Sequence, residues 1–219
     1  MTNENIEDII DSLNRKDTND LVFASDLSQA VDISKVWTSL PEGNIGNESS
    51  YLFYLVKNIE GIYVAAVLDM ENDLHVFVKS DHRKKGYLSR AMNEVILPHL
   101  FQEGRKSQRI TFENPIIGEY VTRNWGFTIT GEGVAEKDLS CYENEVKILP
   151  KLRKIDREEF KLIKRKIDRA RLYLIMASEH VESICGKGKD AELGKLAHDI
   201  LWLDDGVLNF IEKQQGPLA

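Results

Sequence analysis

The stretch VKSDHRKKGYLSRAM, residues 78–92, marks the point where a strand ends and a helix begins. A tight loop at such a junction directs backbone N–H groups outward at the positive end of the helix dipole, which makes a site for a phosphate anion. Gly86 permits the turn and the close approach of a ligand, and the Arg-Lys-Lys run at residues 83–85 supplies positive charge. The stretch predicts an anion-binding loop, with a solvated basic turn as the alternative.

Three strand-like runs lie upstream of this loop. They cover residues 51–57, 62–69 and 74–78, and they are rich in β-branched and aromatic residues. The connections between them are short and contain turn residues. We therefore expect a meander of three antiparallel strands.

The first fifty residues predict two helices, a strand and a loop. The first helix is indicated by apolar residues at helical spacing: Ile6, Ile9, Ile10 and Leu13. Residues 21–24 are typical of a strand. Ser25-Asp26 then offers an N-cap for a second helix that ends before Pro41. The apolar face of that helix would consist of Leu27, Ala30, Val31, Ile33 and Val36. Residues 42–50 are expected to form a loop.

Downstream of residue 78 the period changes to that of a helix. Its apolar face consists of Leu88, Ala91, Met92, Val95, Ile96 and Leu100. We expect Pro98 to end or kink this helix. Residues 109–113 form the next predicted strand, and a crossover of this length makes it parallel to residues 74–78 with a right-handed connection. A short helix over 116–124 and strands over 127–130 and 142–149 complete the prediction.

Beyond Pro150 the pattern is purely helical. The first seam consists of Phe160, Ile163, Ile167, Ala170, Leu174, Ala177, Val181 and Ile184. The second consists of Leu193, Leu196, Ile200, Leu203, Val207 and Phe210. Both repeat at heptad spacing, and a short glycine-bearing link predicts an antiparallel hairpin. Leu201, Trp202 and Leu208 lie outside the seam, so we expect a further surface to cover them. A second copy of the chain is favoured, giving a homodimer through the C-terminal helices; the preceding domain is the alternative.

Composition limits the function further. The chain has 219 residues, 42% of them hydrophobic, and no apolar run approaches the length of about 20 residues that a bilayer span needs. The N-terminus lacks the pattern of a signal peptide. Cys141 and Cys185 are too few and too far apart for a disulfide framework or a thiolate metal site. We expect a cytoplasmic protein without a membrane segment.

Charge is distributed unevenly along the chain. Residues 1–150 hold 15 Lys and Arg against 24 Asp and Glu, whereas residues 151–219 hold 14 against 12. An acidic body repels nucleic acid and attracts cationic small substrates. The basic run over residues 151–171 contains no interleaved aromatic residues that could stack on bases, so we interpret it as a solvated helix face and expect no nucleic-acid partner.

Two motifs in this chain resemble the GNAT superfamily of acyl-CoA N-acyltransferases. The loop resembles the family's pyrophosphate loop, whose pattern is Arg or Gln, two residues, Gly, one residue, then Gly or Ala. Arg83 and Gly86 match this pattern, whereas Leu88 replaces the small residue that is usual there. Residues 118–127, GEYVTRNWGF, look like the family's short helix ending in Gly-Phe. The order of the predicted elements over residues 20–149 also resembles the family.

The resemblance implies an α+β fold in two parts. Residues 1–150 would form a GNAT-like domain with a mixed central sheet and flanking helices, and residues 151–219 the antiparallel helical hairpin. The two central parallel strands would splay apart, with the pantetheine arm of the co-substrate acetyl-CoA between residues 74–78 and 109–113. The residues implied to bind acetyl-CoA are Phe77, Val78, Arg83, Lys84, Lys85, Gly86, Tyr87, Leu88 and Ser89. No metal is implied.

The implied reaction is direct attack of a primary amine, on a small molecule or a peptide, on the thioester. It needs a neutral amine, an oxyanion donor and a proton for the leaving thiolate. Many family members supply that proton from a tyrosine four residues before the Gly of Gly-Phe; here that position is Thr122, with Tyr120 and Tyr87 nearby. The base candidates are Glu113, Asn114, His75, Asp69 and Glu71. The residues alone leave both roles open.

Two classes of function compete for this sequence. The first is an acetyl-CoA-dependent N-acetyltransferase, favoured by the basic loop and Gly86. The second is a non-catalytic acyl-CoA-binding or protein-interaction module, favoured by Leu88 and Thr122. In a third, weaker interpretation the hairpin is the main functional part, a docking or dimerisation device.

Overall fold

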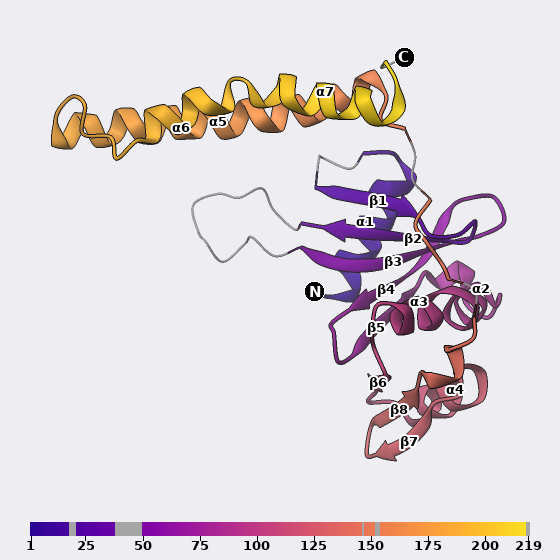
Figure 1. The fold of residues 1–219 in the computed structure, drawn as a ribbon. Helices are drawn as coiled ribbons and strands as arrows, with labels where there is room; N and C mark the ends of the chain where they lie inside the picture. The colour runs from indigo at the N-terminus through magenta and orange to yellow at the C-terminus, as the bar shows by residue number, and fades with distance from the viewer. Residues whose placement is uncertain (18–20, 38–49, 146, 152–153, 218–219) are drawn as a thin grey trace. The chain divides into compact units, whose positions relative to one another are not determined.

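The computed structural model of the chain describes residues 1–17, 21–37, 50–145, 147–151 and 154–217 (Figure 1). The chain divides into two compact units, Met1–Leu152 and Arg153–Ala219. The first combines strands with helices and the second is helical, so the expected α+β class is confirmed. The loop predicted over residues 42–50 lies, except for Ser50, outside the described residues.

A five-stranded antiparallel sheet forms the main part of the first unit. Its strands lie in chain order: β1 (Val22–Asp26), β2 (Val31–Val36), β3 (Tyr51–Lys57), β4 (Tyr63–Asp69) and β5 (Leu74–Val78). The predicted meander β3–β5 and the predicted first strand are confirmed to within two residues. Residues 53–56 of β3 are all buried because helices cover both faces of the sheet.

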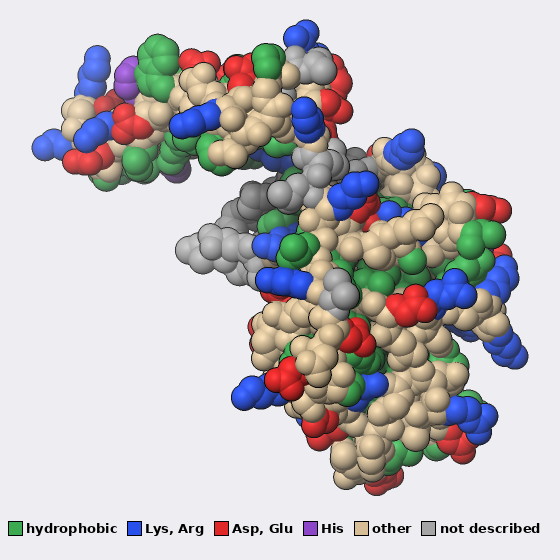
Figure 2. All heavy atoms as spheres, turned by 45° about the vertical axis from the view of Figure 1, so that its right-hand side comes forward, with side chains coloured by type: hydrophobic (Ala, Val, Ile, Leu, Met, Phe, Trp, Pro, Cys, Tyr) green, Lys and Arg blue, Asp and Glu red, His purple; other side chains and the backbone are tan. Residues whose placement is uncertain are grey.

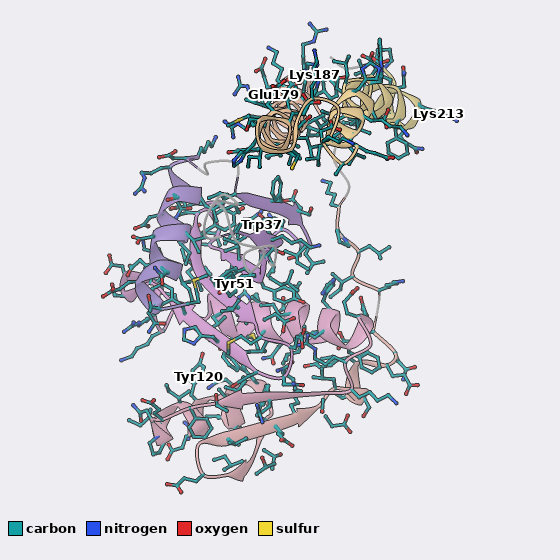
Figure 3. All side chains as sticks on the ribbon, turned by 90° about the vertical axis from the view of Figure 1, so that its left-hand side faces the viewer. Trp37, Tyr51, Tyr120, Glu179, Lys187 and Lys213 are labelled. Carbon is teal, nitrogen blue, oxygen red and sulfur yellow. The ribbon has the colours of Figure 1, made fainter. Side chains whose placement is uncertain are left out.

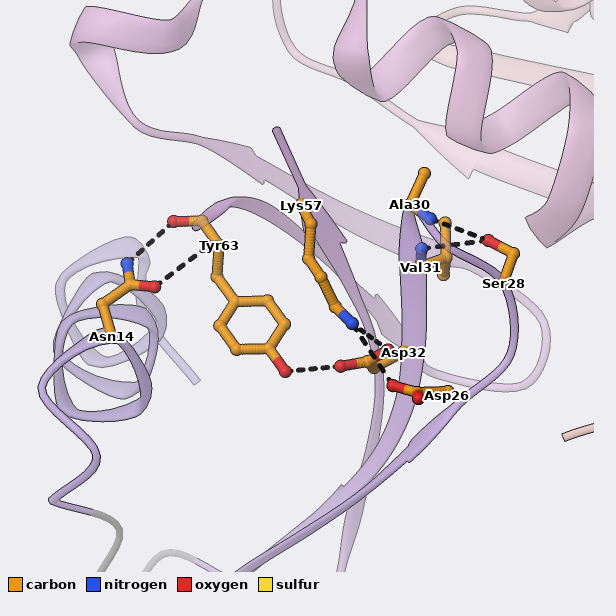
Figure 4. Close-up of polar contacts among 8 residues, drawn as sticks. All are labelled: Asn14, Asp26, Ser28, Ala30, Val31, Asp32, Lys57 and Tyr63. Carbon is orange, nitrogen blue, oxygen red and sulfur yellow. Dashed lines mark hydrogen bonds and ion pairs between the residues drawn. The ribbon is translucent and has the colours of Figure 1, made fainter. Parts of the chain in front are cut away.

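The helix predicted after Ser25-Asp26 is wrong. Residues 31–36 form β2, which pairs with β1 on one side and with β3 on the other. The turn before β2 is held by Ser28, whose Oγ accepts hydrogen bonds from the backbone N–H groups of Ala30 at 3.2 Å and Val31 at 3.0 Å (Figure 4). A short apolar run suits the periods of a helix and of a strand alike, and here the ladder to β3 decides.

A polar cluster joins β1, β2, β3 and β4 (Figure 4). The Lys57 Nζ atom lies 2.7 Å from Asp32 Oδ1 and 3.3 Å from Asp26 Oδ1, and the Tyr63 hydroxyl donates to Asp32. Asp32 is 3% exposed, and this burial raises the pKa of its carboxyl. A buried carboxylate is tolerated when it is paired and hydrogen-bonded, so the cluster has a structural role at this edge of the sheet.

Helix α1 (Asn3–Asn14) covers one face of the sheet and confirms the predicted N-terminal helix. It begins with a capping box between Thr2 and Asn5. Its buried residues, Ile6 and Ile10, pack with apolar side chains of β2–β5. At its end the Asn14 side chain bonds both backbone groups of Tyr63, each at 2.9 Å, which fixes the helix against the start of β4.

The other face of the sheet is covered by a helical segment that starts directly after Gly86. It consists of α2 (Tyr87–Ala91), a π-helical stretch η3 (Met92–Ile96) and α3 (Leu97–Gln102). Pro98 does not end the helix. Because proline has no N–H and its ring crowds the carbonyl four residues earlier, the wider π turn just before it accommodates the ring without a break.

A smaller sheet follows in the first unit. It contains β6 (Ser107–Thr111), β7 (Thr128–Gly131) and β8 (Val134–Asp138), in the antiparallel order β6-β8-β7. β6 begins two residues before the predicted strand. Helix α4 (Pro115–Trp125) confirms the predicted short helix; the Asn114 side chain caps its start, and Gly126, at φ 72°, ends it in the left-handed region.

The strand predicted over residues 142–149 is wrong, because β8 fills that place in the sheet. A turn at Gly133, whose φ is 68°, leads from β7 directly into β8. Tyr142 lies buried in a short 3-10 helix, η4 (Ser140–Tyr142). Ile148 packs on the core, and its N–H donates to the Gln102 side chain at 2.7 Å. Among the described residues of 142–149, only Tyr142 and Ile148 are not exposed, and none of these residues forms a strand.

The second unit contains α5 (Arg157–Cys185), α6 (Leu193–Ile200) and α7 (Leu203–Gln215). Contacts between residues 155 and 215, 164 and 204, and 178 and 190 show that α5 runs antiparallel to the other two helices. The predicted helix pair is thus confirmed, but its second helix is interrupted at residues 201–202.

The predicted seam of the second helix is confirmed at Leu193, Ile200 and Val207, which are half-buried, and is wrong by one position at its other three residues. Leu196, Leu203 and Phe210 are 50%, 49% and 64% exposed. The positions that face α5 instead include Ala197, Asp204 and Ile211, with Asp204 paired to Lys164. Positions 196, 203 and 210 and positions 197, 204 and 211 have the same seven-residue spacing. The Asp204–Lys164 ion pair and the small Ala197 favour the second set as the side that packs on α5.

On α5, likewise, three predicted seam residues, Ala170, Ala177 and Ile184, are exposed. Leu201 and Trp202 are exposed as expected, whereas Leu208 is half-buried. Figure 2 shows green hydrophobic side chains among the charged ones on the surface of this unit.

Candidate functional site

A cleft opens between the parallel strands β5 and β6. The two strands meet at one bridge, between Asp73 and Arg109. There the Asp73 carboxylate accepts hydrogen bonds from the backbone N–H of Thr111 at 3.0 Å, from the Thr111 hydroxyl, and from the N–H of Leu74 at 2.8 Å. Beyond this joint the described residues of the two strands form no further ladder, so each strand has an edge that faces the cleft.

The cleft is an open cavity of about 1220 Å³. Its walls are residues 74–78 of β5, residues 110–114 at the end of β6 and just after it, and five residues of α4 that include Tyr120 and Trp125. Residues 82–84 and 86–89, Asn3 and residues 132–134 complete the lining. A cavity of this size, with apolar walls and a few polar groups, suits an elongated ligand.

The loop at the end of β5 has the geometry that anion binding needs. After a short 3-10 helix, η2 (Ser80–His82), the chain passes through the left-handed region at Lys84, with φ 60°, and at Gly86, with φ 80°. Gly86 is the N-cap residue of α2 and has no side chain to bond the first N–H groups of the helix. The Arg83 guanidinium is anchored by an Nε–H bond of 3.3 Å to the carbonyl of Val78. The start of α2 and the cationic residues Arg83 and Lys84 therefore lie next to one another in this loop.

The structure brings most of the residues expected to bind acetyl-CoA to this cavity. Those that line it are Phe77, Val78, Arg83, Lys84, Gly86, Tyr87, Leu88 and Ser89. Lys85 alone is outside the lining. Leu88 is 8% exposed and packs in the core as well as lining the cavity, which explains why a large apolar residue occupies this position.

Helix α4 presents Tyr120 to the cavity. The Tyr120 hydroxyl lies 2.6 Å from Ser89 Oγ, and the Trp125 indole N–H donates to the same Ser89 oxygen at 3.3 Å. Figure 3 labels Tyr120, which lies at the level between the larger and the smaller sheet. Thr122 is exposed and does not belong to the cavity lining. The phenol, and not the threonine, therefore faces the space where a ligand would lie.

The candidate bases are divided between the cavity and the core. His75 lines the cavity, but its Nε2 lies 2.9 Å from the Asn3 side chain, so it also anchors α1. Glu113 and Asn114 line the cavity, with Asn114 engaged as the cap of α4. Asp69 pairs with Arg105 at 2.8 Å and is 4% exposed in its side chain, and Glu71 lies outside the lining. Glu113 is the carboxylate that the cavity leaves accessible.

Sequence reasoning missed several lining residues, among them Asn3, Glu132 and Trp125. The β6–β8 pairing ends at Thr111 and Val134, and the Phe112 N–H donates to the Gly133 carbonyl at 2.8 Å. Glu113 and Glu132 each lie one residue away from this contact, and both line the cavity. Glu132 could have been found from the Glu132-Gly133 turn, but only if the strand after that turn, β8, had been predicted as the neighbour of β6. Trp125 is 3% exposed, but its indole N–H donates to Ser89 at the cavity wall.

Other features of the described residues narrow the chemistry. No group of three or more His, Cys, Asp or Glu in this part of the chain is arranged to hold a metal ion. Cys141 and Cys185 are free and exposed. No described helix combines the length and apolar character needed to cross a membrane.

No family model matches the chain, and a search of curated proteins found no match either. Its function is therefore inferred from the cleft and from the two sequence motifs.

Proposed function

We propose that the first unit is an acetyl-CoA-dependent N-acetyltransferase of the GNAT superfamily that acts on a primary amine. The observation that carries this proposal is the cleft between β5 and β6, with the Arg83–Ser89 loop at its end. Among the described residues, these parallel strands bridge only between Asp73 and Arg109, so backbone groups along the facing edges can bond a ligand. Pantetheine carries amide groups that can bond such an edge, and the loop can hold a pyrophosphate.

The donor would lie with its pyrophosphate at the loop and its thioester further along the cleft. Arg83 and Lys84 supply charge, and the amides that follow Gly86 supply directed hydrogen bonds. Gly86 has no atom within 4 Å of the position that a Cβ would take, so the space above it is open to a ligand.

In the proposed reaction the neutral amine attacks the thioester carbonyl carbon, and the C–S bond then breaks. Tyr120 donates its phenolic proton to the departing thiolate, and the new amide nitrogen loses a proton to Glu113 or to water. We assign the acid role to Tyr120 because it lines the cavity whereas Thr122 does not. Glu113, with Glu132 beside it, would also attract the cationic form of the amine before attack.

A non-catalytic acyl-CoA-binding module is the second candidate. Leu88 favours it, because this buried side chain narrows the approach to the loop where the family has a small residue. Such a module would bind acetyl-CoA and release no thiol.

Both candidate functions require that the protein binds acetyl-CoA, and thermal unfolding with and without acetyl-CoA tests this binding. A ligand at a hundredfold its Kd stabilises the folded state by about 2.7 kcal/mol. We expect a clear rise in Tm that Arg83→Glu or Gly86→Val abolishes. Lys85→Glu, a charge reversal at the neighbouring residue outside the lining, is the control and should keep most of the rise. No rise in the wild type at millimolar acetyl-CoA would rule out both candidates.

Thiol release from acetyl-CoA then separates the two. The acceptors are butylamine, spermidine and a lysine-containing peptide, each compared with a sample without amine. Amine-dependent release supports the transferase. Stabilisation without release from any acceptor supports the binding module.

A further inference from the structure

Three side chains at the cavity wall form a closed triangle. Ser89 comes from the first turn of α2, and Tyr120 and Trp125 come from α4. The Ser89 Oγ and Tyr120 hydroxyl oxygens are 2.6 Å apart, and Trp125 Nε1 is 3.3 Å from Ser89 Oγ. The triangle is closed by an edge-to-face contact between the Tyr120 and Trp125 rings, with centroids 5.5 Å apart at 81°.

The chemistry of these groups fixes part of the hydrogen-bond direction. An indole N–H can only donate, so Ser89 Oγ must accept from Trp125. The Ser89 hydroxyl hydrogen is then available for another acceptor. While Tyr120 is neutral, either oxygen of the 2.6 Å contact can be the donor. Once Tyr120 has lost its proton, its oxygen can only accept, and Ser89 must donate to it.

We propose that Ser89 and Trp125 are positioning residues for Tyr120, forming a relay from the Trp125 N–H through the Ser89 hydroxyl to the phenol oxygen. The relay holds the phenol toward the cavity and stabilises the phenolate that forms during acetyl transfer. This inference rests on the proposed function, in which Tyr120 is the proton donor. Hydrogen bonds in a chain polarise one another, so the Trp125 N–H makes Ser89 a better donor to the phenolate.

The proton balance of the step is complete within the proposed reaction. The C–N bond forms and the C–S bond breaks, and the Tyr120 proton passes to the thiolate sulfur. The phenolate, held by Ser89, regains a proton from the solvent or from the group that deprotonates the amide nitrogen. The products are an N-acetyl amine and CoA thiol.

Packing alone does not account for the triangle. Tyr120 is 42% exposed, so its hydroxyl could bond to water, yet it is directed to Ser89 at short range. Trp125 is 3% exposed, and its N–H needs a partner inside the protein. The Ser89 hydroxyl contacts the polar groups of both, and Ser89 also lines the cavity three positions after Gly86. The proton donor is thereby connected to the loop that would hold the cofactor.

The test is a pH titration of the ligand-free, full-length protein labelled with [4-¹³C]tyrosine. The chain has seven tyrosines, and the Tyr120 signal is the one that Tyr120→Phe removes. We expect Ser89→Ala to move the ionisation of this signal upward by roughly one pH unit, because the phenolate loses a charge-assisted hydrogen bond. Trp125→Phe should move it upward by less.

Two controls keep the result specific. Ser89→Thr retains the hydroxyl and should titrate like the wild type, and Thr122→Ala alters a hydroxyl outside the cavity and should do the same. If Ser89→Ala fails to fold, Trp125→Phe and Ser89→Thr still test the relay. An unchanged Tyr120 titration in Ser89→Ala, or in Trp125→Phe when Ser89→Ala cannot be measured, overturns the inference.

Kinetics separate this inference from the proposed function. With an active acceptor, Ser89→Ala should lower kcat by about tenfold or more and shift the alkaline limb of its pH profile, and Ser89→Thr should restore both. Amine-dependent thiol release with an unchanged Tyr120 titration would overturn the relay and leave the transferase standing. A shifted Tyr120 titration without amine-dependent thiol release would support the hydrogen-bond relay but contradict its role in acetyl transfer.

Discussion

The two units of this chain bury their apolar side chains to very different degrees. In Met1–Leu152, two clusters pack on opposite faces of the five-stranded sheet, and many of their members are fully buried. In Arg153–Ala219, only Ala197 and Ile211 are buried hydrophobic residues among those described. The first unit has a core of its own. The second is a helix pair whose contact surface is narrow and partly polar.

This difference indicates that the second unit packs against a further surface. The described part of the second unit exposes large apolar side chains, including Tyr173, Trp202 and Phe210. Soluble monomers seldom leave large contiguous apolar patches bare, so a further surface is expected on this unit. A second copy of the chain, forming a four-helix bundle with self-complementary contacts, is the arrangement that we propose.

The largest expected effect is a loss of stability when a cavity is made in the core of the first unit. Leu97 is fully buried in the cluster between the sheet and α3, so Leu97→Ala should lower the free energy of unfolding by about 2–5 kcal/mol. Ile59, in the turn before β4, is 87% exposed, and Ile59→Ala should change it by less than about 0.5 kcal/mol. Urea unfolding of both variants measures the contrast, and equal losses would contradict the assigned core.

The second prediction concerns the surface that covers the helical unit. Light scattering should find the full-length protein dimeric and the protein truncated after residue 152 monomeric. Trp202 is 62% exposed, and Trp202→Glu should dissociate the dimer because it places a charge in an apolar contact. Trp202→Phe retains an apolar ring and serves as the control. A monomeric full-length protein at tens of micromolar would exclude the bundle.

The third prediction concerns His99, a buried histidine of the first unit. His99 is 3% exposed, and its Nδ1 lies 3.0 Å from the Tyr54 hydroxyl, whereas His180 and His198 of the second unit are exposed. Burial lowers the pKa of His99, with Glu103 opposing this in part. The unfolded chain therefore binds a proton more readily than the folded protein.

The sign follows from this difference in proton binding. The stability contributed by neutral His99 is complete above its unfolded pKa of about 6.5 and decreases as the pH falls from there toward the lowered folded value. Between pH 7 and pH 5, Tm should decrease more in the wild type than in His99→Gln. Parallel Tm curves for the two proteins would show that His99 is not held neutral.

The smallest effect is expected at Thr122 of α4, which can be compared with Tyr120 on the same helix. Thr122 is exposed and lies outside the cavity lining, so Thr122→Ala should lower turnover by less than tenfold. Tyr120→Phe should lower it by about 10²–10⁴-fold, the range of a general acid. Initial rates of thiol release measure both. A larger loss for Thr122→Ala would indicate that Thr122, or a water bound by it, is the proton donor.

Elements with strong local signals were predictable from the sequence. The meander β3–β5 and helices α1 and α4 have clear periods, turns or caps, and the structure places them within about two residues of the prediction. The strand–loop–helix stretch over residues 78–92 was also placed correctly, and with it most of the cavity lining around the loop.

The errors lie where local patterns are ambiguous and distant contacts decide. Residues 31–36 became a strand because β3 was available as a partner, and no local feature reveals that. The inner stripe of the C-terminal helices was set by Asp204 and Lys164, which are 40 positions apart. The Ser89–Tyr120–Trp125 triangle likewise joins two helices whose residues are 31 and 36 positions apart. The sequence pointed to Ser89 and Tyr120 but gave no sign that they contact each other or Trp125.

Hydrogen exchange measured by mass spectrometry with and without acetyl-CoA tests the central claim most directly, because it reports on both units at once. Acetyl-CoA should slow exchange in peptides covering residues 74–90 and 110–125, where the two strands, the loop and α4 line the cavity. Peptides from residues 157–215 should exchange equally fast in both samples. Slowed exchange confined to the helical unit, or no change at a saturating concentration, would contradict a cofactor site between β5 and β6.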